Sequence, residues 1–236
     1  MTHPATDEAA GKPGAADLLE IFYAPRAVFA RRRNGEFGLV YVALVVLGVI
    51  VWLATRGLMQ DALDAITSAA IAKQVASGQI PAERVEAATK FAKTLSSLVL
   101  LIFYLIGPFI TGLILWIVGK IAKVPAIGTV ALMVATFSFF PRLIGNIASA
   151  VIAMLRPEGS IINAAQISVG PGLLLGANAG AKVIALAARL DLTLLWGVVL
   201  MAIGIQVAGK ATRNQAWATA IGTWAVATVL AVVFAR

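Results

Sequence analysis

Ionisable side chains inside long apolar stretches are the residues of this sequence whose position suggests chemistry. Two of them stand out: Arg142 in the apolar stretch 124–155, and Asp191 at the start of the apolar stretch 191–209. Burying a charge in hydrocarbon costs about 2.5–3.5 kcal/mol even on the mildest scale, so such residues usually carry function. A buried arginine could bind an anionic lipid, a substrate or a carboxylate. Asp191, at the end of its stretch, is expected to cap a helix.

The residue types that most enzymes need are missing from the apolar stretches. The sequence has no cysteine, and its single histidine, His3, lies in a polar N-terminal stretch. Intramembrane proteolysis needs paired aspartates, a serine–histidine pair or metal ligands, and the apolar stretches contain none of these sets. Proton-coupled transport needs mid-membrane carboxylates or histidines, which are missing too. We therefore expect no enzymatic activity, no cofactor and no bound metal.

The elements that must position Arg142 and Asp191 are membrane spans. Hydrophobic residues make up 60% of the 236 residues and charged residues only 13%, with a mean hydropathy of +0.92. Soluble domains have about 45–50% apolar and about 25% charged residues. A helix crossing about 30 Å of hydrocarbon needs about 20 apolar residues. We predict an all-α, polytopic integral membrane protein: a bundle of five transmembrane helices with short amphipathic surface helices.

Five stretches have the length and apolarity of a span. The predicted spans are residues 37–55, 95–119, 139–155, 191–209 and 216–235. Together they form a five-helix membrane domain over residues 37–235. Before this domain, residues 1–16 are predicted to be a disordered cytoplasmic tail, and residues 17–36 an amphipathic segment on the cytoplasmic surface.

The third stretch, residues 124–155, is too long to cross the membrane once without a steep tilt. Pro141 lacks a backbone N–H, which predicts a break near residues 138–141. In one arrangement residues 125–139 lie on or half inside the membrane surface, and Arg142 extends to the cytoplasmic headgroups. In the other, Arg142 is buried inside the bundle. The sequence leaves both arrangements open.

Lysines and arginines near the span ends predict the orientation of the chain. Three basic groups fall on one side if five helices alternate: Lys12, Arg26, Arg31, Arg32 and Arg33 before the first span, Lys120 and Lys123 after the second, and Lys210 and Arg213 after the fourth. We therefore predict a cytoplasmic amino terminus and a carboxyl terminus outside. The net charge of +8 then reflects topology and lipid contact, and no nucleic-acid partner is expected.

Two polar regions flank the first span. In residues 17–36, Asp17 and Glu20 have the spacing of a capping box, which predicts a short helix from Leu18. The arginines of this region are expected to contact lipid phosphates, and a docking epitope for a partner is the alternative. Residues 56–94 have helical periodicity, with a stop at Ser77–Gly78 and a new helix from Pro81 that continues into the second span. This region is an amphipathic cap or a docking surface.

Several stretches together resemble the YIP (Ypt-interacting protein) domain family, in its bacterial branch. They are IFYAPRAVFARRR at residues 21–33, GKIAKVPAIGTVALMVATFSFFPRLIG at 119–145, RLDLTLLWGVVLMAIGIQVAGK at 189–210 and AWATAIGTWAV at 216–226. The resemblance rests on Pro25 and Phe29 before the first span, on Pro141 followed by Arg142, and on the Leu-Asp…Trp opening with Asp191 and Trp196. It covers residues 18–235.

The resemblance implies a five-helix membrane domain with a cytoplasmic amino terminus. Eukaryotic members are linked to vesicle traffic and to small GTPases of the Rab type. This sequence lacks the eukaryotic Asp-Leu-x-Gly-Pro signature and the long cytoplasmic tail, so we do not carry that role over. For bacterial members the family implies a membrane protein, in some cases one that assists export transporters.

Two functional hypotheses follow. The first is a non-enzymatic scaffold or accessory subunit of a bacterial inner membrane, acting on membrane organisation or on a partner transport complex. The alternative is a small channel or transporter that uses the broken third span. Expected partners are membrane lipids, another membrane protein such as a transporter or secretion component, or a second copy of the chain. The candidate functional residues are Pro25, Phe29, Arg31, Arg32, Arg33, Pro141, Arg142, Asp191, Trp196 and Lys210.

Overall fold

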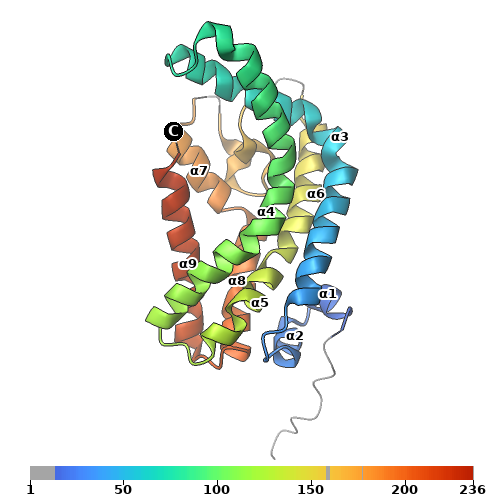
Figure 1. Cartoon of the computed structure of the whole chain (residues 1–236), viewed down its shortest axis with the longest axis vertical. Helices are drawn as coiled ribbons and strands as arrows, with labels where there is room; N and C mark the ends of the chain where they lie inside the picture. The colour runs from blue at the N-terminus through green and yellow to red at the C-terminus, as the bar shows by residue number, and fades with distance from the viewer. Residues whose placement is uncertain (1–13, 158–159, 177, 236) are drawn as a thin grey trace, which may run out of the picture. The chain divides into compact units, whose positions relative to one another are not determined.

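The computed structural model describes residues 14–157, 160–176 and 178–235. Within these ranges every regular element is helical (Figure 1). In chain order the elements are α1 (Asp17–Glu20), α2 (Pro25–Arg31), α3 (Gly38–Ala76), η2 (Ala82–Arg84), α4 (Val85–Ile121), α5 (Ile127–Ser138), α6 (Phe140–Leu155), η3 (Ala164–Ile167), η4 (Pro171–Leu174), α7 (Ala181–Arg189), α8 (Leu192–Val207) and α9 (Arg213–Val233). The predicted all-α class is confirmed. Of the tail predicted for residues 1–16, residues 1–13 lie outside the described residues.

The described helices include enough long apolar segments for a multi-pass membrane protein. Four segments are long and apolar enough to cross a membrane: Gly38–Ala76, Leu101–Ile121, Ile127–Leu155 and Arg213–Val233. A fifth crossing results if α7 and α8, which are bent by 50° at residues 190–191, count as one broken span. The count of four to five agrees with the predicted polytopic class.

Contacts divide the chain into two compact units. Unit 1 comprises Met1–Tyr41, Pro108–Phe140 and Gly197–Trp224. Unit 2 comprises Val42–Gly107, Pro141–Trp196 and Ala225–Arg236. Each unit therefore combines three segments that are distant in the sequence.

The helix α5 is the core of unit 1. Nine of its 12 residues are buried, among them Phe137 and Ser138. Glycines on neighbouring helices let it approach closely: a Cβ on Gly197 would lie 2.6 Å from the Ser138 carbonyl oxygen, and one on Gly119 would lie 2.4 Å from Ile127. The structure shows α5 covered by protein, and the position of residues 125–139 relative to the membrane surface stays a prediction.

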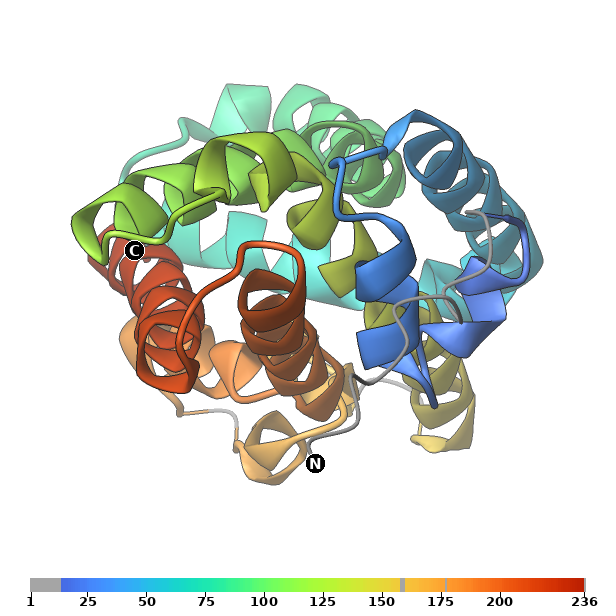
Figure 2. The same ribbon diagram turned by 90° about the horizontal axis from the view of Figure 1, so that it is seen from below.

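Two turns of unit 1, after α4 and after α8, lie at the end of the molecule that faces the viewer in Figure 2. Hydrogen bonds join them. The Ala126 N–H donates to the Gly209 carbonyl at 3.2 Å. From α9, Gln215 Nε2 donates to the Lys123 carbonyl at 3.1 Å. Each turn contains a lysine in the left-handed region, with φ of 57° at Lys123 and 55° at Lys210.

Helices α3 and α4, each of which has residues in both units, are longer than a membrane is thick. The 39 residues of α3 and 37 of α4 correspond to about 58 and 55 Å of helix, against about 30 Å of hydrocarbon. The uncharged residues 37–55 and 94–119 correspond to about 28 and 39 Å of helix. The charged remainder, residues 56–93, contains about 31 Å of α3 and about 14 Å of α4. We call this part the hairpin extension.

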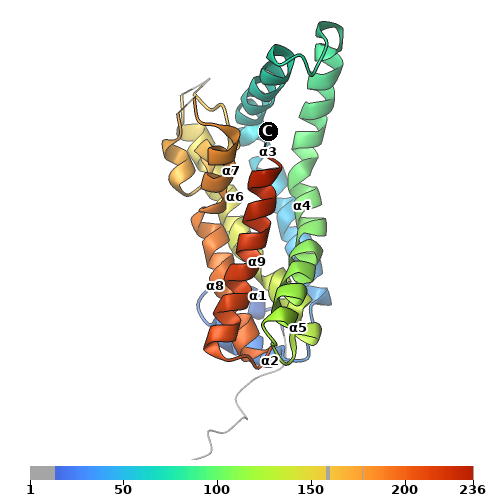
Figure 3. The same ribbon diagram turned by 90° about the vertical axis from the view of Figure 1, so that its left-hand side faces the viewer.

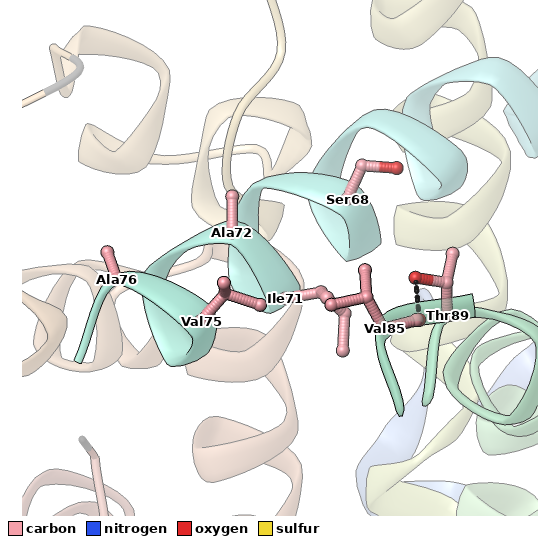
Figure 4. Close-up of a pocket in the computed structure, with 7 residues that line it drawn as sticks. All are labelled: Ser68, Ile71, Ala72, Val75, Ala76, Val85 and Thr89. Atoms are coloured by element: carbon pink, nitrogen blue, oxygen red, sulfur yellow. Dashed lines mark hydrogen bonds between the residues drawn. The ribbon is translucent and has the colours of Figure 1, made fainter. Parts of the chain in front are cut away.

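The two arms of the hairpin extension leave an apolar groove between them (Figure 4). Its volume is about 440 Å³, and its walls include Ile71, Val75 and Val85. An ion pair of 2.9 Å between Lys93 Nζ and Asp64 Oδ2 joins the arms. The arms are thus held together although the groove between them is unfilled.

The base of the hairpin extension is anchored on an irregular segment of unit 2. The short helices η3 and η4 pack against each other and against α7 (Figure 3). Ile161 and Ile167 of this segment form a buried cluster with Ala62 of α3 and Ala153 of α6. The lower part of the extension is therefore fixed by apolar packing.

Candidate functional site

The first group of candidate residues forms an ion-pair cluster at the amino-terminal end of unit 1. Asp17 of α1 is only 1% exposed and accepts from two arginines near the end of α2. Its Oδ1 pairs with Arg31 Nη2 at 2.5 Å, and its Oδ2 pairs with Arg32 Nε at 2.7 Å. Arg31 also forms an ion pair with Glu20. We call Asp17, Glu20, Arg31 and Arg32 the ion-pair cluster.

The carboxylate of Asp17 does not cap α1, which corrects the capping-box prediction. The residue before the helix is Ala16, and it makes no side-chain cap. Burial alone would raise the pKa of Asp17, but hydrogen bonds from Arg31, Arg32 and the Gly14 N–H outweigh it and lower that pKa below its ordinary value. Asp17 prefers the arginines because two guanidinium partners stabilise a buried carboxylate more than backbone N–H groups alone.

Arg32 links the ion-pair cluster to the aromatic core of unit 1. Only 3% of this residue is exposed, and its guanidinium carbon lies 5.5 Å from the centroid of the Phe137 ring. Phe29 is fully buried and meets Phe137 edge-on, with 5.6 Å between ring centroids. Pro25 begins α2, where its missing N–H costs nothing. The expectation that these arginines contact lipid phosphates therefore fails for Arg32, which is buried in the protein.

A second group of polar side chains lies in unit 2, on helices that cross the membrane. The buried Tyr104 of α4 accepts a hydrogen bond of 2.8 Å at its hydroxyl oxygen from Asn146 Nδ2 of α6. The tyrosine ring fills the space that Gly48 leaves on α3, where a Cβ would lie 2.7 Å from Tyr104 Cδ2. Tyr104 lies near the start of the apolar segment Leu101–Ile121.

Arg142 lies one helical turn before Asn146 on α6. Its guanidinium carbon is 4.7 Å from the centroid of the Phe103 ring on α4, and the residue is partly exposed. In the sequence, Arg142 is near the middle of the apolar segment Ile127–Leu155. Which of the two arrangements Arg142 has in a membrane stays a prediction. The break itself is at Phe139, within the predicted residues 138–141.

Asp191 caps α8, so its predicted role is confirmed. Its Oδ1 accepts from the Thr193 N–H at 2.8 Å and from the Leu194 N–H at 3.3 Å. Its Oδ2 accepts from the Val169 N–H at 2.8 Å. Close packing fixes this cap against α6, because a Cβ on Gly145 would lie 2.6 Å from Thr193 Oγ1.

Arg189, at the end of α7, completes this group. Its Nε donates to Thr228 Oγ1 of α9 at 3.2 Å. Arg189 lies within electrostatic range of Arg142, and Arg142 lies within range of Asp191. We call the five residues Tyr104, Arg142, Asn146, Arg189 and Asp191 the polar layer.

The structure divides the predicted candidate residues between the two units. Pro141 is buried at the second position of α6, and Trp196 of α8 is 49% exposed. Arg33 and Lys210 are exposed residues of unit 1. Pro25, Phe29, Arg31, Arg32, Arg33 and Lys210 belong to unit 1, and Pro141, Arg142, Asp191 and Trp196 to unit 2.

Sequence reasoning missed Asp17, Tyr104 and Asn146 as partners of the arginines. For Tyr104 and Asn146 a signal existed, because a polar side chain in an apolar span is rare and needs a partner. For Asp17 no local signal existed, since its partners follow 14 and 15 residues later.

These helices, spans and buried polar groups define a polytopic helical membrane protein. A family model of the Yip1 domain matches residues 19–234. The chain therefore belongs to the Yip1 domain family, as its motifs predicted. No curated protein matches the chain, and no solved structure does.

Proposed function

We propose that this Yip1 family protein is a non-enzymatic scaffold or accessory subunit of a bacterial inner membrane, from the bacterial branch of the family. It acts on membrane organisation or on a partner transport complex. The partner has the chemistry of a helical membrane protein, because contact must form partly within and partly above the bilayer.

The observation that carries this proposal is the hairpin extension. Its arms contain about 31 Å of α3 and about 14 Å of α4, more than a connection between two spans requires. Its base is anchored by the cluster around Ala62 and Ile167. Its outer part keeps the apolar groove lined by Ile71 and Val85. A rigid extension with an unfilled apolar groove supports a role in contact rather than in catalysis.

A pair of matched substitutions on α3 tests the proposal. Ala72 lines the groove, while Ala70 is an exposed residue on the opposite face of the same helix. The full chain is purified from its native membrane in lipid discs, and proteins that co-elute at fixed stoichiometry are identified by mass spectrometry. We expect Ala72→Arg to remove such a partner and Ala70→Arg to retain it.

Two results would count against the scaffold. Equal retention of the partner by both variants would exclude the groove as the contact. A pure homo-oligomer with lipid alone would favour the channel or transporter alternative, which flux assays in liposomes would then test. In those assays Arg142→Leu should abolish flux if the broken span conducts.

The proposed orientation has the amino terminus in the cytoplasm, supported by the basic residues around Lys123 and Lys210. Because the sequence has no cysteine, single cysteines give a clean test. A membrane-impermeant maleimide applied outside spheroplasts should label Ser77→Cys in the turn after α3. It should not label Asn214→Cys at the start of α9. Labelling of Asn214→Cys alone would reverse the orientation.

A further inference from the structure

Four exposed basic side chains belong to the two hydrogen-bonded turns of unit 1. Lys120 and Lys123 are at the turn after α4, and Lys210 and Arg213 are at the turn after α8. We call these turns, residues 119–126 and 208–215, the paired turns. Lysine and arginine are fully charged at neutral pH, so the paired turns carry four positive charges.

Hydrogen bonds hold the paired turns against each other. The Ala126 N–H donates to the Gly209 carbonyl, and Gln215 Nε2 donates at 3.1 Å to the carbonyl oxygens of both Ala122 and Lys123. The cations of the two turns are therefore gathered at one end of unit 1 (Figure 2). A signal for membrane orientation needs charge near the span ends, but it does not need two turns that are joined in this way.

No acidic side chain balances the charge of the paired turns. The sequence has no aspartate or glutamate between Glu86 and Glu158, and none after Asp191. In the part of the chain that the structure describes, none of the four cations forms an ion pair. The surface is therefore basic without local compensation, and it suits an anionic partner.

Two exposed tryptophans flank the paired turns. Trp116 precedes Lys120 by four residues on α4, and Trp217 follows Arg213 by four residues on α9, so each lies on the same helix face as its cation. Lys120 is beside the end of the apolar segment Leu101–Ile121, and Arg213 begins the apolar segment Arg213–Val233. Tryptophan is enriched where membrane helices meet the lipid headgroups. These positions favour lipid headgroups as the anionic partner.

We propose that the paired turns form one binding surface for the headgroups of anionic phospholipids. The net negative charge of such a headgroup complements the four cations, whereas a zwitterionic headgroup carries its own positive charge. The surface requires neither the scaffold function nor the proposed orientation, so each of these proposals can fail without the others.

A binding titration of the purified full chain in an uncharged detergent tests the surface. The chain is titrated with fluorescently labelled phosphatidylglycerol and, as the control, with labelled phosphatidylcholine of the same acyl chains. We expect phosphatidylglycerol to bind at least several-fold more tightly, and added salt to reduce this preference because exposed charges are screened. Equal affinities for the two lipids, or a preference that salt does not reduce, would overturn the proposal.

Three double variants connect this binding to the paired turns. Lys120→Gln with Lys123→Gln neutralises one turn, and Lys210→Gln with Arg213→Gln neutralises the other. Each should weaken phosphatidylglycerol binding about tenfold or more, because each removes two cations from one surface.

The control is Lys73→Gln with Lys90→Gln, which neutralises two exposed lysines of the hairpin extension. It should bind phosphatidylglycerol like the unaltered chain. If one turn variant fails to fold, the variant of the other turn decides. Full binding by either folded turn variant, or an equal loss in the control, shows that the two turns do not form the surface.

Discussion

The ion-pair cluster of unit 1 and the polar layer of unit 2 each contain two arginines, but they treat these arginines differently. In the cluster, Arg31 and Arg32 meet the carboxylates of Asp17 and Glu20. In the layer, Arg142 stacks on an aromatic ring, and the nearby carboxylate of Asp191 caps a helix instead. Both groups hold two arginines against other side chains. They differ in what their carboxylates contact: those of the cluster contact the arginines, and that of the layer caps a helix.

This difference separates arginines that are paired with carboxylates from an arginine that stacks on an aromatic ring. A guanidinium held by a buried carboxylate fixes one segment of the chain against another. Four measurements test this distinction.

The largest expected effect is the loss of the central carboxylate of the ion-pair cluster. Asp17→Asn leaves the buried Arg32 without its carboxylate partner and leaves Arg31 with Glu20 alone, which should lower the free energy of unfolding by about 3 kcal/mol. Denaturant unfolding in detergent micelles measures this. Glu36→Gln, at an exposed side chain in the same region, should change it by less than about 0.5 kcal/mol. Equal losses in the two variants would show that the cluster is not structural.

The next effect concerns the packing that positions the Tyr104 hydroxyl. Gly48→Ala places a Cβ 2.7 Å from the tyrosine ring and should destabilise the protein by about 1–3 kcal/mol. On the same helix, Gly57 has no atom within 4 Å of an added Cβ, so Gly57→Ala should stabilise by up to about 1 kcal/mol. Thermal unfolding of both variants gives the comparison. We expect Gly48→Ala to lower the unfolding temperature and Gly57→Ala to raise it. A change in the same direction for both variants would mean that Tyr104 is free to move.

The dependence of the unfolding free energy on pH should come more from the ion-pair cluster than from the exposed regions. The folded pKa of Asp17 lies below its unfolded value, so its contribution is complete above the unfolded pKa of about 3.9. The contribution is lost as the pH falls through the folded pKa. We expect unfolding curves of the unaltered chain to lose stability below about pH 4 and those of Asp17→Asn to be flatter there. Parallel curves would contradict the assignment.

The smallest effect is expected at the ion pair between Lys93 and Asp64 in the hairpin extension. Both side chains are 40% exposed, and solvent screening leaves such a pair about 0.2–1 kcal/mol at most. Asp64→Asn should therefore change the unfolding free energy by less than 1 kcal/mol or so. A loss as large as that of Asp17→Asn would mean that the number of ion pairs, rather than their burial, decides stability.

Much of the architecture could be predicted because the bilayer restricts it. Apolar length predicted a polytopic protein with four to five crossings, Pro141 predicted the break at Phe139, and the position of Asp191 predicted its helix cap. The Ser77–Gly78 pair predicted the end of α3 at Ala76. Each of these features depends on residues that are near one another in the sequence.

The features that could not be predicted depend on distant residues. Asp17 has the local pattern of a cap, but its arginine partners come from the end of α2. Residues 125–139 suit a surface helix by length alone, yet glycines such as Gly119 and Gly197 let α5 be buried.

The two left-handed lysines have a consequence for how the chain inserts into a membrane. A left-handed backbone costs a residue other than glycine about 1–2 kcal/mol, and glycine would fit both turns without that strain. Lysine at 123 and 210 instead adds positive charge beside short turns on the proposed cytoplasmic side, where charge opposes translocation. With the proposed orientation, these two turns exchange some folded-state stability for charges that hold them on the cytoplasmic side during insertion.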